Sequence, residues 1–396
     1  MSKNKTLIVP MSYPDITNAE REAVMGVLQT PNLSMGPQID LFEKSVADFI
    51  GVDHAIGVNS GTAGLHLCVR AADIQQGDLV ITTPFSFVAS TNVILFEKAI
   101  PVFVDVDPKT GNIDPILVEQ AICDLRKGGV SAGKWLPRQN ADFSGKLKAI
   151  LAVDVFGQPA DYDPLRKIAA ENGIKLIEDS CESLGAEYKA QKTGLLGDYG
   201  VFAFYPNKQI TTGEGGMIVT NDGRAAGYMR AMRSQGRAPG DNWLQHTVMG
   251  YNYRLDEMSA ALGRVQMARI EELLAKRQQV ANWYGERIAP LSGVEAPVLS
   301  AETTRVSWFV YVIRFDPDLD RDQIAARLTG KGIPVRPYFL PIHLQPYLVQ
   351  QFGYQEGDFP ITEDLGKRGL ALPFSGAMTE DQVDQVCQVL VEVLPR

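Results

Sequence analysis

The sequence predicts an α/β fold: a mostly parallel central sheet flanked by helices, followed by a smaller C-terminal α+β domain. From about residue 52 to 220, short apolar runs alternate with amphipathic segments, which is the pattern of a sheet covered on both faces. A long helical stretch at Asp256–Ile288 then leads to a second alternation. That part contains a predicted strand at Trp308–Ile313 and a closing helix at Thr379–Leu394.

The apolar runs of the first part are the expected strands of the large sheet. They are Ala55–Val58, Leu79–Ile81, Val102–Val104, Ile150–Val153 and Met217–Val219. The run Gly173–Asp179 predicts a further buried strand, and it delivers a carboxylate at its C-terminal end. Because open α/β sheets bind ligands at the carboxyl ends of their strands, we expect Asp179 to lie at a ligand site.

The length of 396 residues favours two domains. We expect residues 1–29 to form an N-terminal arm and helix that pack with the small domain. Residues 30–255 form the large domain, and residues 256–396 form a linking helix and the small C-terminal domain. The polar segment 124–148, rich in Gly and Lys with an isolated Trp135, is interpreted as a loop insertion, and a surface loop is favoured over a substrate lid.

Composition restricts the class of protein. The hydrophobic content of 45% is ample for a core, and the formal charge of −9 is spread along the chain, which argues against a nucleic-acid surface. No stretch reaches the roughly 20 apolar residues of a membrane helix, so we expect a soluble, cytoplasmic protein without membrane contact. Four scattered cysteines lack metal-ligand spacing, so we expect reduced thiols and no metal site.

Three features together indicate a pyridoxal 5′-phosphate (PLP) site. Lys208 lies between the aromatic run Val201–Tyr205 and the glycine-rich turn Gly213–Gly216, where a Schiff-base lysine is expected. Asp179 is a suitable acidic partner for a pyridinium nitrogen. The turn Ser60–Gly64 follows an apolar strand and opens a helix, and backbone N–H groups at a helix start suit a phosphate dianion.

With these motifs the chain resembles the DegT/DnrJ/StrS family of nucleotide-sugar aminotransferases, which are fold-type I PLP enzymes. The resemblance covers nearly the whole chain. It is carried by Pro14-Asp15-Ile16, Leu33-Ser34-Met35-Gly36-Pro37, Val58-Asn59-Ser60-Gly61-Thr62-Ala63, Pro84-Phe85-Ser86-Phe87, Phe156-Gly157-Gln158-Pro159-Ala160-Asp161, Glu178-Asp179, Lys208, Gly213-Glu214-Gly215-Gly216, Gly250-Tyr251-Asn252-Tyr253-Arg254-Leu255-Asp256, Pro341-Ile342-His343 and Leu372-Pro373.

The resemblance implies roles for the two central residues and for the groups around the cofactor. Lys208 would hold PLP and Asp179 would pair with its ring nitrogen. Gly61 and Thr62 would bind the phosphate, Phe87 would stack on the ring face, and Gln158 would contact the ring hydroxyl. A further cofactor contact is implied for Glu182, which stands where relatives often carry Gln or His. Ordinary packing for Phe87 and a turn role for Gln158 are the alternatives.

One departure from the family pattern concerns the phosphate. Ala203 stands five residues before Lys208, where the family commonly has a phosphate-binding Ser. The resemblance offers Asn252 of the neighbouring subunit as a replacement donor, which implies a homodimer with shared active sites; alone, Asn252 would be called a turn residue. For the substrate side we expect Met35, Gly36 and His343, although a structural role for His343 is nearly as well supported.

The implied activity is PLP-dependent transfer of an amino group from an amino acid, with L-glutamate expected, to a nucleotide-linked keto sugar. The reaction would use a Lys208 aldimine and ping-pong kinetics. A cyclitol or carbocyclic ketone is an alternative acceptor. A PLP-dependent sugar dehydratase is disfavoured because that branch replaces the lysine with histidine, and a non-enzymatic regulator is disfavoured because Lys208 and Asp179 are both present. A Rossmann dehydrogenase would need a G-x-G-x-x-G turn that the early strands lack.

Overall fold

The central sheet contains seven strands in the order β1-β9-β8-β5-β4-β2-β3. The computed structural model describes residues 8–139, 145–238, 240, 242 and 244–395. The strands are β1 (His54–Val58), β2 (Leu79–Thr82), β3 (Ile100–Phe103), β4 (Leu147–Val153), β5 (Lys175–Asp179), β8 (Tyr199–Ala203) and β9 (Gly216–Thr220). Only β9 runs against its neighbours, β1 and β8, and the remaining pairs are parallel. The predicted α/β class with a mostly parallel sheet is confirmed.

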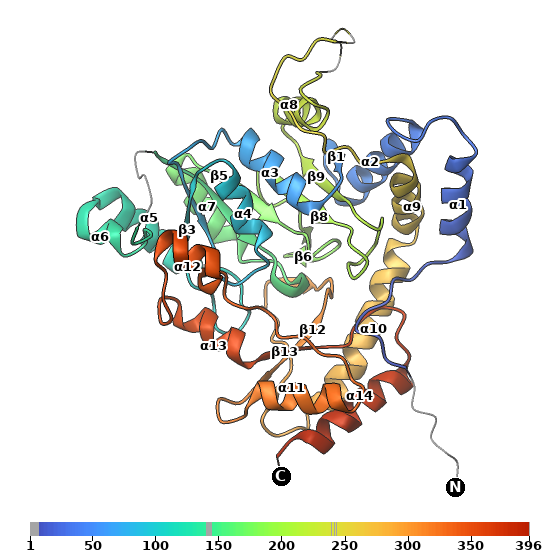
Figure 1. Ribbon diagram of the computed structural model, residues 1–396, viewed down its shortest axis with the longest axis vertical. Coiled ribbons are helices and arrows are strands. Elements are labelled where there is room, and N and C mark those ends of the chain that lie inside the picture. Colours follow the sequence, from blue (N-terminus) through green and yellow to red (C-terminus); the bar gives the residue numbers. More distant parts are fainter. Residues whose placement is uncertain (1–7, 140–144, 239, 241, 243, 396) are drawn as a thin grey trace.

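Helices cover both faces of this sheet (Figure 1). They are α2 (Pro37–Ile50), α3 (Gly61–Ala71), α4 (Ala89–Phe96), α5 (Pro115–Lys127), α7 (Tyr162–Asn172) and α8 (Gly223–Arg233), with a 3₁₀ turn at Val155–Gly157. The short helix α6 (Gly129–Gly133) packs on α5. Strand β4 shows the two faces, because successive side chains of a strand point to opposite sides. Leu151 packs into the core that contains α3 and α8, whereas Ile150 and Ala152 pack into the core that contains α5 and α7.

The smaller C-terminal part is built around the antiparallel sheet β10-β12-β13. Its elements are β10 (Val294–Glu295), β12 (Tyr311–Phe315), α11 (Arg321–Gly330), α12 (Pro346–Phe352), α13 (Pro360–Arg368), β13 (Gly369–Leu372) and α14 (Glu380–Val393), with a 3₁₀ turn at Ile342–Leu344. A third, small sheet joins β11 (Thr303–Arg305) to β6 (Glu187–Tyr188) and β7 (Gln191–Lys192). It ties the segment before β12 to the large sheet's domain.

The predicted linking helix is two helices, α9 (Glu257–Ala268) and α10 (Ile270–Ile288), which meet at Arg269. The side chain of Arg269 pairs with Asp15 and Glu20, so this junction holds α1 (Asn18–Leu28) against α9. Before α1, the backbone N–H of Phe374 donates to the carbonyl of Met11 at 2.9 Å. The described part of the N-terminal arm therefore contacts the small domain. The boundaries at 29 and 255 stay predictions, and residues 1–7 lie outside the described residues.

The segment 124–148 is more ordered than the inserted loop that we expected. Helix α5 continues to Lys127, and α6 follows at once. The polar composition of the segment suggested a surface loop, but Asp124 is hydrogen-bonded within the segment. Its carboxylate accepts a hydrogen bond from Trp135 Nε1 at 3.2 Å. Arg138 pairs with Asp358 and so ties this segment to the C-terminal part. Residues 140–144 of the expected insertion lie outside the described residues.

Candidate active site

The predicted site residues gather at one edge of the central sheet. At this edge Gly216, the first residue of β9, pairs with Val58 at the end of β1 and with Ala203 at the end of β8. The end of β5 lies on the other side of β8, where Asp179 pairs with Val201. Since Lys208 lies in the turn between β8 and β9, the topology brings the lysine, Asp179 and the start of α3 to the same edge.

The start of α3 forms a cradle that has no room for side chains. Ser60 caps the helix, because its Oγ accepts a hydrogen bond from the Ala63 N–H at 3.1 Å. The N–H groups of Gly61 and Thr62 belong to the first turn of the helix, which lacks intrahelical acceptors and attracts anions. A Cβ atom on Gly61 would lie 2.8 Å from both Ala203 Cβ and Cys181 Sγ. Glycine at 61 and a small residue at 203 are therefore required together.

Asp179 is held by its neighbours and is almost entirely buried, with 5% of its surface exposed. Its Oδ2 accepts a hydrogen bond from Ser90 Oγ at 2.7 Å, and its Oδ1 accepts one from the Cys181 N–H at 3.3 Å. Ser90 Oγ is in turn 3.0 Å from Ser86 Oγ. This short chain of hydroxyl groups fixes the direction of the carboxylate. The preceding Glu178 has a structural role, since its carboxylate accepts the N–H groups of Gly194, Leu196 and Gly197.

Lys208 is mostly enclosed, with 13% of its side chain exposed. Its Nζ lies 3.7 Å from the ring centroid of Phe309 and 3.7 Å from Glu182 Oε1. Burial raises the pKa of Glu182, while the charge of Lys208 acts in the opposite direction. The other oxygen, Glu182 Oε2, accepts the backbone N–H of Phe156 at 2.9 Å. Glu182 thus links the loop after β4 to the lysine.

Phe87 is exposed although it lies beside buried residues of the sheet edge. It follows β2, the residue is 64% exposed, and its carbonyl accepts a hydrogen bond from the N–H of Ser90, the residue that contacts Asp179. A large exposed aromatic side chain next to a buried carboxylate is suited to stack on a flat ligand ring. Core packing, the alternative role, does not fit this exposure.

The structure gives two predicted residues different surroundings from those expected. The Gln158 amide donates to the Val298 carbonyl at 3.2 Å, and its oxygen accepts the Ser300 N–H. This side chain is therefore engaged with the 298–300 segment. His343 is fully buried, and its Nε2 lies 2.9 Å from Glu363 Oε1. The ring also packs against Tyr354 and Phe359, and contact of His343 with substrate stays a prediction.

The remaining predicted residues lie near the edges of the large domain. Asn252 is exposed, and its carbonyl accepts a hydrogen bond from Asn59 Nδ2 at 3.4 Å, so its segment runs beside the turn that leads into the cradle of the same chain. Its contact with a partner's phosphate stays a prediction. Met35 is exposed with a positive φ of 57°. Gly36 caps α2, and a Cβ there would lie 2.7 Å from Glu257 Oε2.

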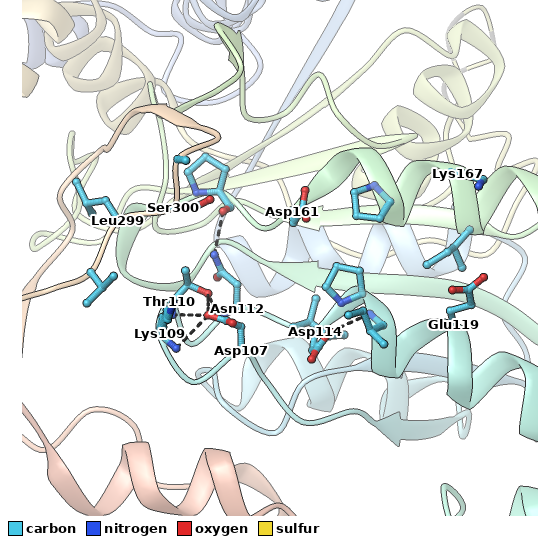
Figure 2. Close-up of a pocket in the computed structure, with 18 of the residues that line it drawn as sticks. Asp107, Lys109, Thr110, Asn112, Asp114, Glu119, Asp161, Lys167, Leu299 and Ser300 are labelled. Carbon is cyan, nitrogen blue, oxygen red and sulfur yellow. Dashed lines mark hydrogen bonds between the residues drawn. The ribbon is translucent and has the colours of Figure 1, made fainter.

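A separate cavity of about 740 Å³ is lined mainly by residues of the large domain (Figure 2). It lies between the 107–116 segment, helix α7 and residues 298–301. None of the predicted site residues is among the described residues that line it. Its carboxylates are largely engaged locally: Asp107 accepts the Thr110 N–H and Asp114 caps α5. This cavity is therefore separate from the sheet edge that carries Asp179, Lys208 and the glycine cradle.

Three residues at this edge were not predicted: Ser90, Phe309 and Arg277. Arg277 of α10 is buried and donates hydrogen bonds to four carbonyl groups, those of Asn207, Lys208, Trp308 and Phe309. Burial lowers the pKa of its guanidinium to about 10, which leaves it charged at neutral pH. A helix pattern marks Arg277 only as an arginine on an amphipathic helix, so no sequence signal could have assigned these partners.

The chain is similar to known aminotransferases over nearly its whole length. The sequence model of the DegT/DnrJ/EryC1/StrS aminotransferase family matches residues 14–391. The GDP-perosamine synthase of Caulobacter vibrioides is 36% identical over 389 residues, with 98% of each protein covered. A solved DegT DnrJ EryC1 StrS aminotransferase from Brucella abortus is 30% identical, with a TM-score of 0.84 over 95% of each chain. S. venezuelae DesV, solved in complex with a ketimine intermediate, is 29% identical, with a TM-score of 0.85 over 98% of each chain. The predicted fold-type I architecture is confirmed.

Proposed function

The chain belongs to the DegT/DnrJ/EryC1/StrS aminotransferase family and is an aminotransferase, and from this premise we propose its cofactor and substrates. The proposed reaction transfers the amino group of an amino acid, L-glutamate, to a keto sugar linked to a nucleotide, with PLP as cofactor. The observation that carries the proposal is the joint position of Asp179, Lys208 and the Gly61 cradle at one sheet edge.

The residues present fit PLP. A phosphate ester needs backbone donors that it can approach closely, and the start of α3, where Gly61 has no side chain, meets this need. A ring nitrogen needs a carboxylate that keeps its proton, and Asp179 is buried and oriented by Ser90. A flat ring needs an aromatic partner, for which Phe87 is available. Gly61, Thr62, Phe87, Asp179 and Lys208 would therefore hold the group.

Bound PLP would supply a ring that stabilises the negative charge left when the amino carbon loses its proton. Asp179 would keep a proton on the ring nitrogen. Lys208 Nζ would accept the proton from the amino carbon and donate it to the C4′ carbon of the cofactor in the same half-reaction, and the acceptor half-reaction would run this transfer in reverse. Its enclosure by Phe309 and Glu182 limits water at the amine. Because donor and acceptor use the same lysine, we expect ping-pong kinetics.

The nucleotide-linked sugar is supported by the relatives. The Caulobacter vibrioides relative is a GDP-perosamine synthase, and a second relative, 30% identical over 383 residues, is the dTDP-3-amino-3,4,6-trideoxy-alpha-D-glucose transaminase of Streptomyces venezuelae. We also propose a homodimer in which Asn252 reaches the partner's cofactor phosphate, since Asn252 is exposed beside the cradle.

The test combines cofactor mapping with a substrate screen. Borohydride reduction of PLP-treated protein should label Lys208 in a peptide map, and a label on another lysine would contradict the assignment. The purified protein is then incubated with glutamate and several GDP- and dTDP-linked keto sugars, and 2-oxoglutarate is measured by mass spectrometry. Activity with carbocyclic ketones alone would favour the alternative acceptor, and the Lys208→Ala variant is the negative control.

A further inference from the structure

Arg277 is unusual because it is a buried cation without an acidic partner. The side chain is 4% exposed, and within the described residues no carboxylate forms an ion pair with it. Burying a charge is unfavourable unless hydrogen bonds compensate it. Here the compensation comes only from carbonyl oxygens of the backbone, supported by the ring of Phe374, whose centroid lies 5.8 Å from Cζ. Such an arrangement fixes the chain segments that supply the carbonyls.

Arg277 joins two chain segments: one carries Lys208, and the other carries the aromatic ring that lies beside the Lys208 amine. One nitrogen, Nη2, donates to the carbonyls of Asn207, at 3.1 Å, and Lys208. The other, Nη1, donates to the carbonyls of Trp308, at 3.0 Å, and Phe309, at 3.3 Å. The ring of Phe309 is the one that lies 3.7 Å from Lys208 Nζ. A single planar group therefore sets the position of both the lysine and the aromatic ring beside it.

We infer that Arg277 is a positioning residue that holds Lys208 and Phe309 in register across the junction of the two domains. The inference rests on the proposed function of Lys208. The planar guanidinium presents its N–H donors in a fixed fork, which a flexible lysine side chain cannot reproduce. Because Arg277 belongs to α10 while its partners lie in the lysine turn and before β12, displacement of α10 would also displace the amine.

The test compares Arg277→Gln and Arg277→Lys with a matched control, Arg321→Gln. Arg321 of α11 is also buried and donates to two carbonyls, those of Gly366 and Gly369, but it lies in the small domain. The readout that needs no cofactor is trace acetylation of the full-length, cofactor-free chain. The rate at Lys208 is measured relative to Lys44, whose side chain is 68% exposed. A loosened lysine turn exposes its amine, whereas a general loss of stability does not single out Lys208.

We expect Arg277→Gln to raise the relative acetylation rate of Lys208 about tenfold, with a smaller rise in Arg277→Lys and none in Arg321→Gln. In the PLP-loaded enzyme, kcat should fall about a hundredfold in Arg277→Gln while KM for glutamate changes less than about threefold. If Arg277→Gln does not fold, the same two measurements on Arg277→Lys decide whether the inference holds. If the folded Arg277 variants keep the wild-type acetylation rate of Lys208 and the wild-type kcat, the inference is overturned. A wild-type enzyme that transfers no amino group would instead contradict the proposed function, and the acetylation result would still judge Arg277.

Discussion

Replacing Asp179 with Asn tests the role of its charge with little change in shape. The carboxylate is 5% exposed, so solvent screens it weakly, and an Asn oxygen can still accept the Ser90 hydroxyl now bonded at 2.7 Å. The fold should therefore persist. Removing one partner of a buried charge pair costs about 3–5 kcal/mol. At about 1.4 kcal/mol for each tenfold change in rate, kcat/KM should fall about a thousandfold.

The assay is the glutamate half-reaction, followed by stopped-flow absorbance of the PLP-loaded protein. Asp78→Asn is a matched control, because Asp78 is also a buried carboxylate with backbone partners but precedes β2 at the opposite edge of the sheet. It should lower thermal stability without slowing the half-reaction. The reasoning is refuted if Asp179→Asn folds, binds PLP and reacts within about threefold of the wild-type rate.

Three further predictions concern the cradle, helix α1 and the dimer. Gly61→Ala should lower the free energy of unfolding by about 1–3 kcal/mol and weaken PLP binding about tenfold in a titration, because its Cβ would lie 2.8 Å from Ala203 Cβ and Cys181 Sγ. The control Gly227→Ala, whose Cβ would meet nothing within 4 Å, should change neither quantity. Burial alone would raise the pKa of Glu20, but hydrogen bonds from Thr17, Arg269 and Gln266 lower it from 4.5 to about 2. The ionised form therefore stabilises the fold above pH 4.5, and this stability is lost as the pH falls towards 2. Glu20→Gln should cost about 3 kcal/mol in urea unfolding at pH 7, with a difference that shrinks over that window, and a pH-independent difference would contradict the assignment. Lys208→Ala and Asn252→Asp, each nearly inactive alone, should regain one working site per mixed dimer when coexpressed; no recovery in mixed dimers verified by native mass spectrometry would place Asn252 away from the partner's phosphate.

The parts of the site that the sequence could predict are those fixed by local pattern. The buried run before Asp179 marks a strand and its end, and the capped glycine turn at Gly61 marks a helix start. The turn between two strands marks Lys208. Because the carboxyl ends of parallel strands share an edge, these three positions converge without knowledge of side-chain contacts.

The parts that could not be predicted depend on partners far apart in the chain. Ser90 lies 89 residues from Asp179, and Arg277 lies 69 residues from Lys208. The Gln158 side-chain oxygen accepts the Ser300 N–H, and Nε2 of His343 pairs with Glu363. A buried polar side chain takes whichever partner the packing supplies, so its direction follows from the tertiary structure and not from its neighbours in sequence.

Isotope tracing of the transferred amino group tests the central claim most directly. The enzyme is incubated with PLP, ¹⁵N-labelled L-glutamate and a nucleotide-linked keto sugar that was active in the screen, and the sugar product is analysed by mass spectrometry. We predict a nucleotide-linked amino sugar that carries the ¹⁵N label, with 2-oxoglutarate formed in equal amount, and no labelled product from Lys208→Ala. An unlabelled product, or labelled product formed equally well by Lys208→Ala, would contradict amino transfer at this site.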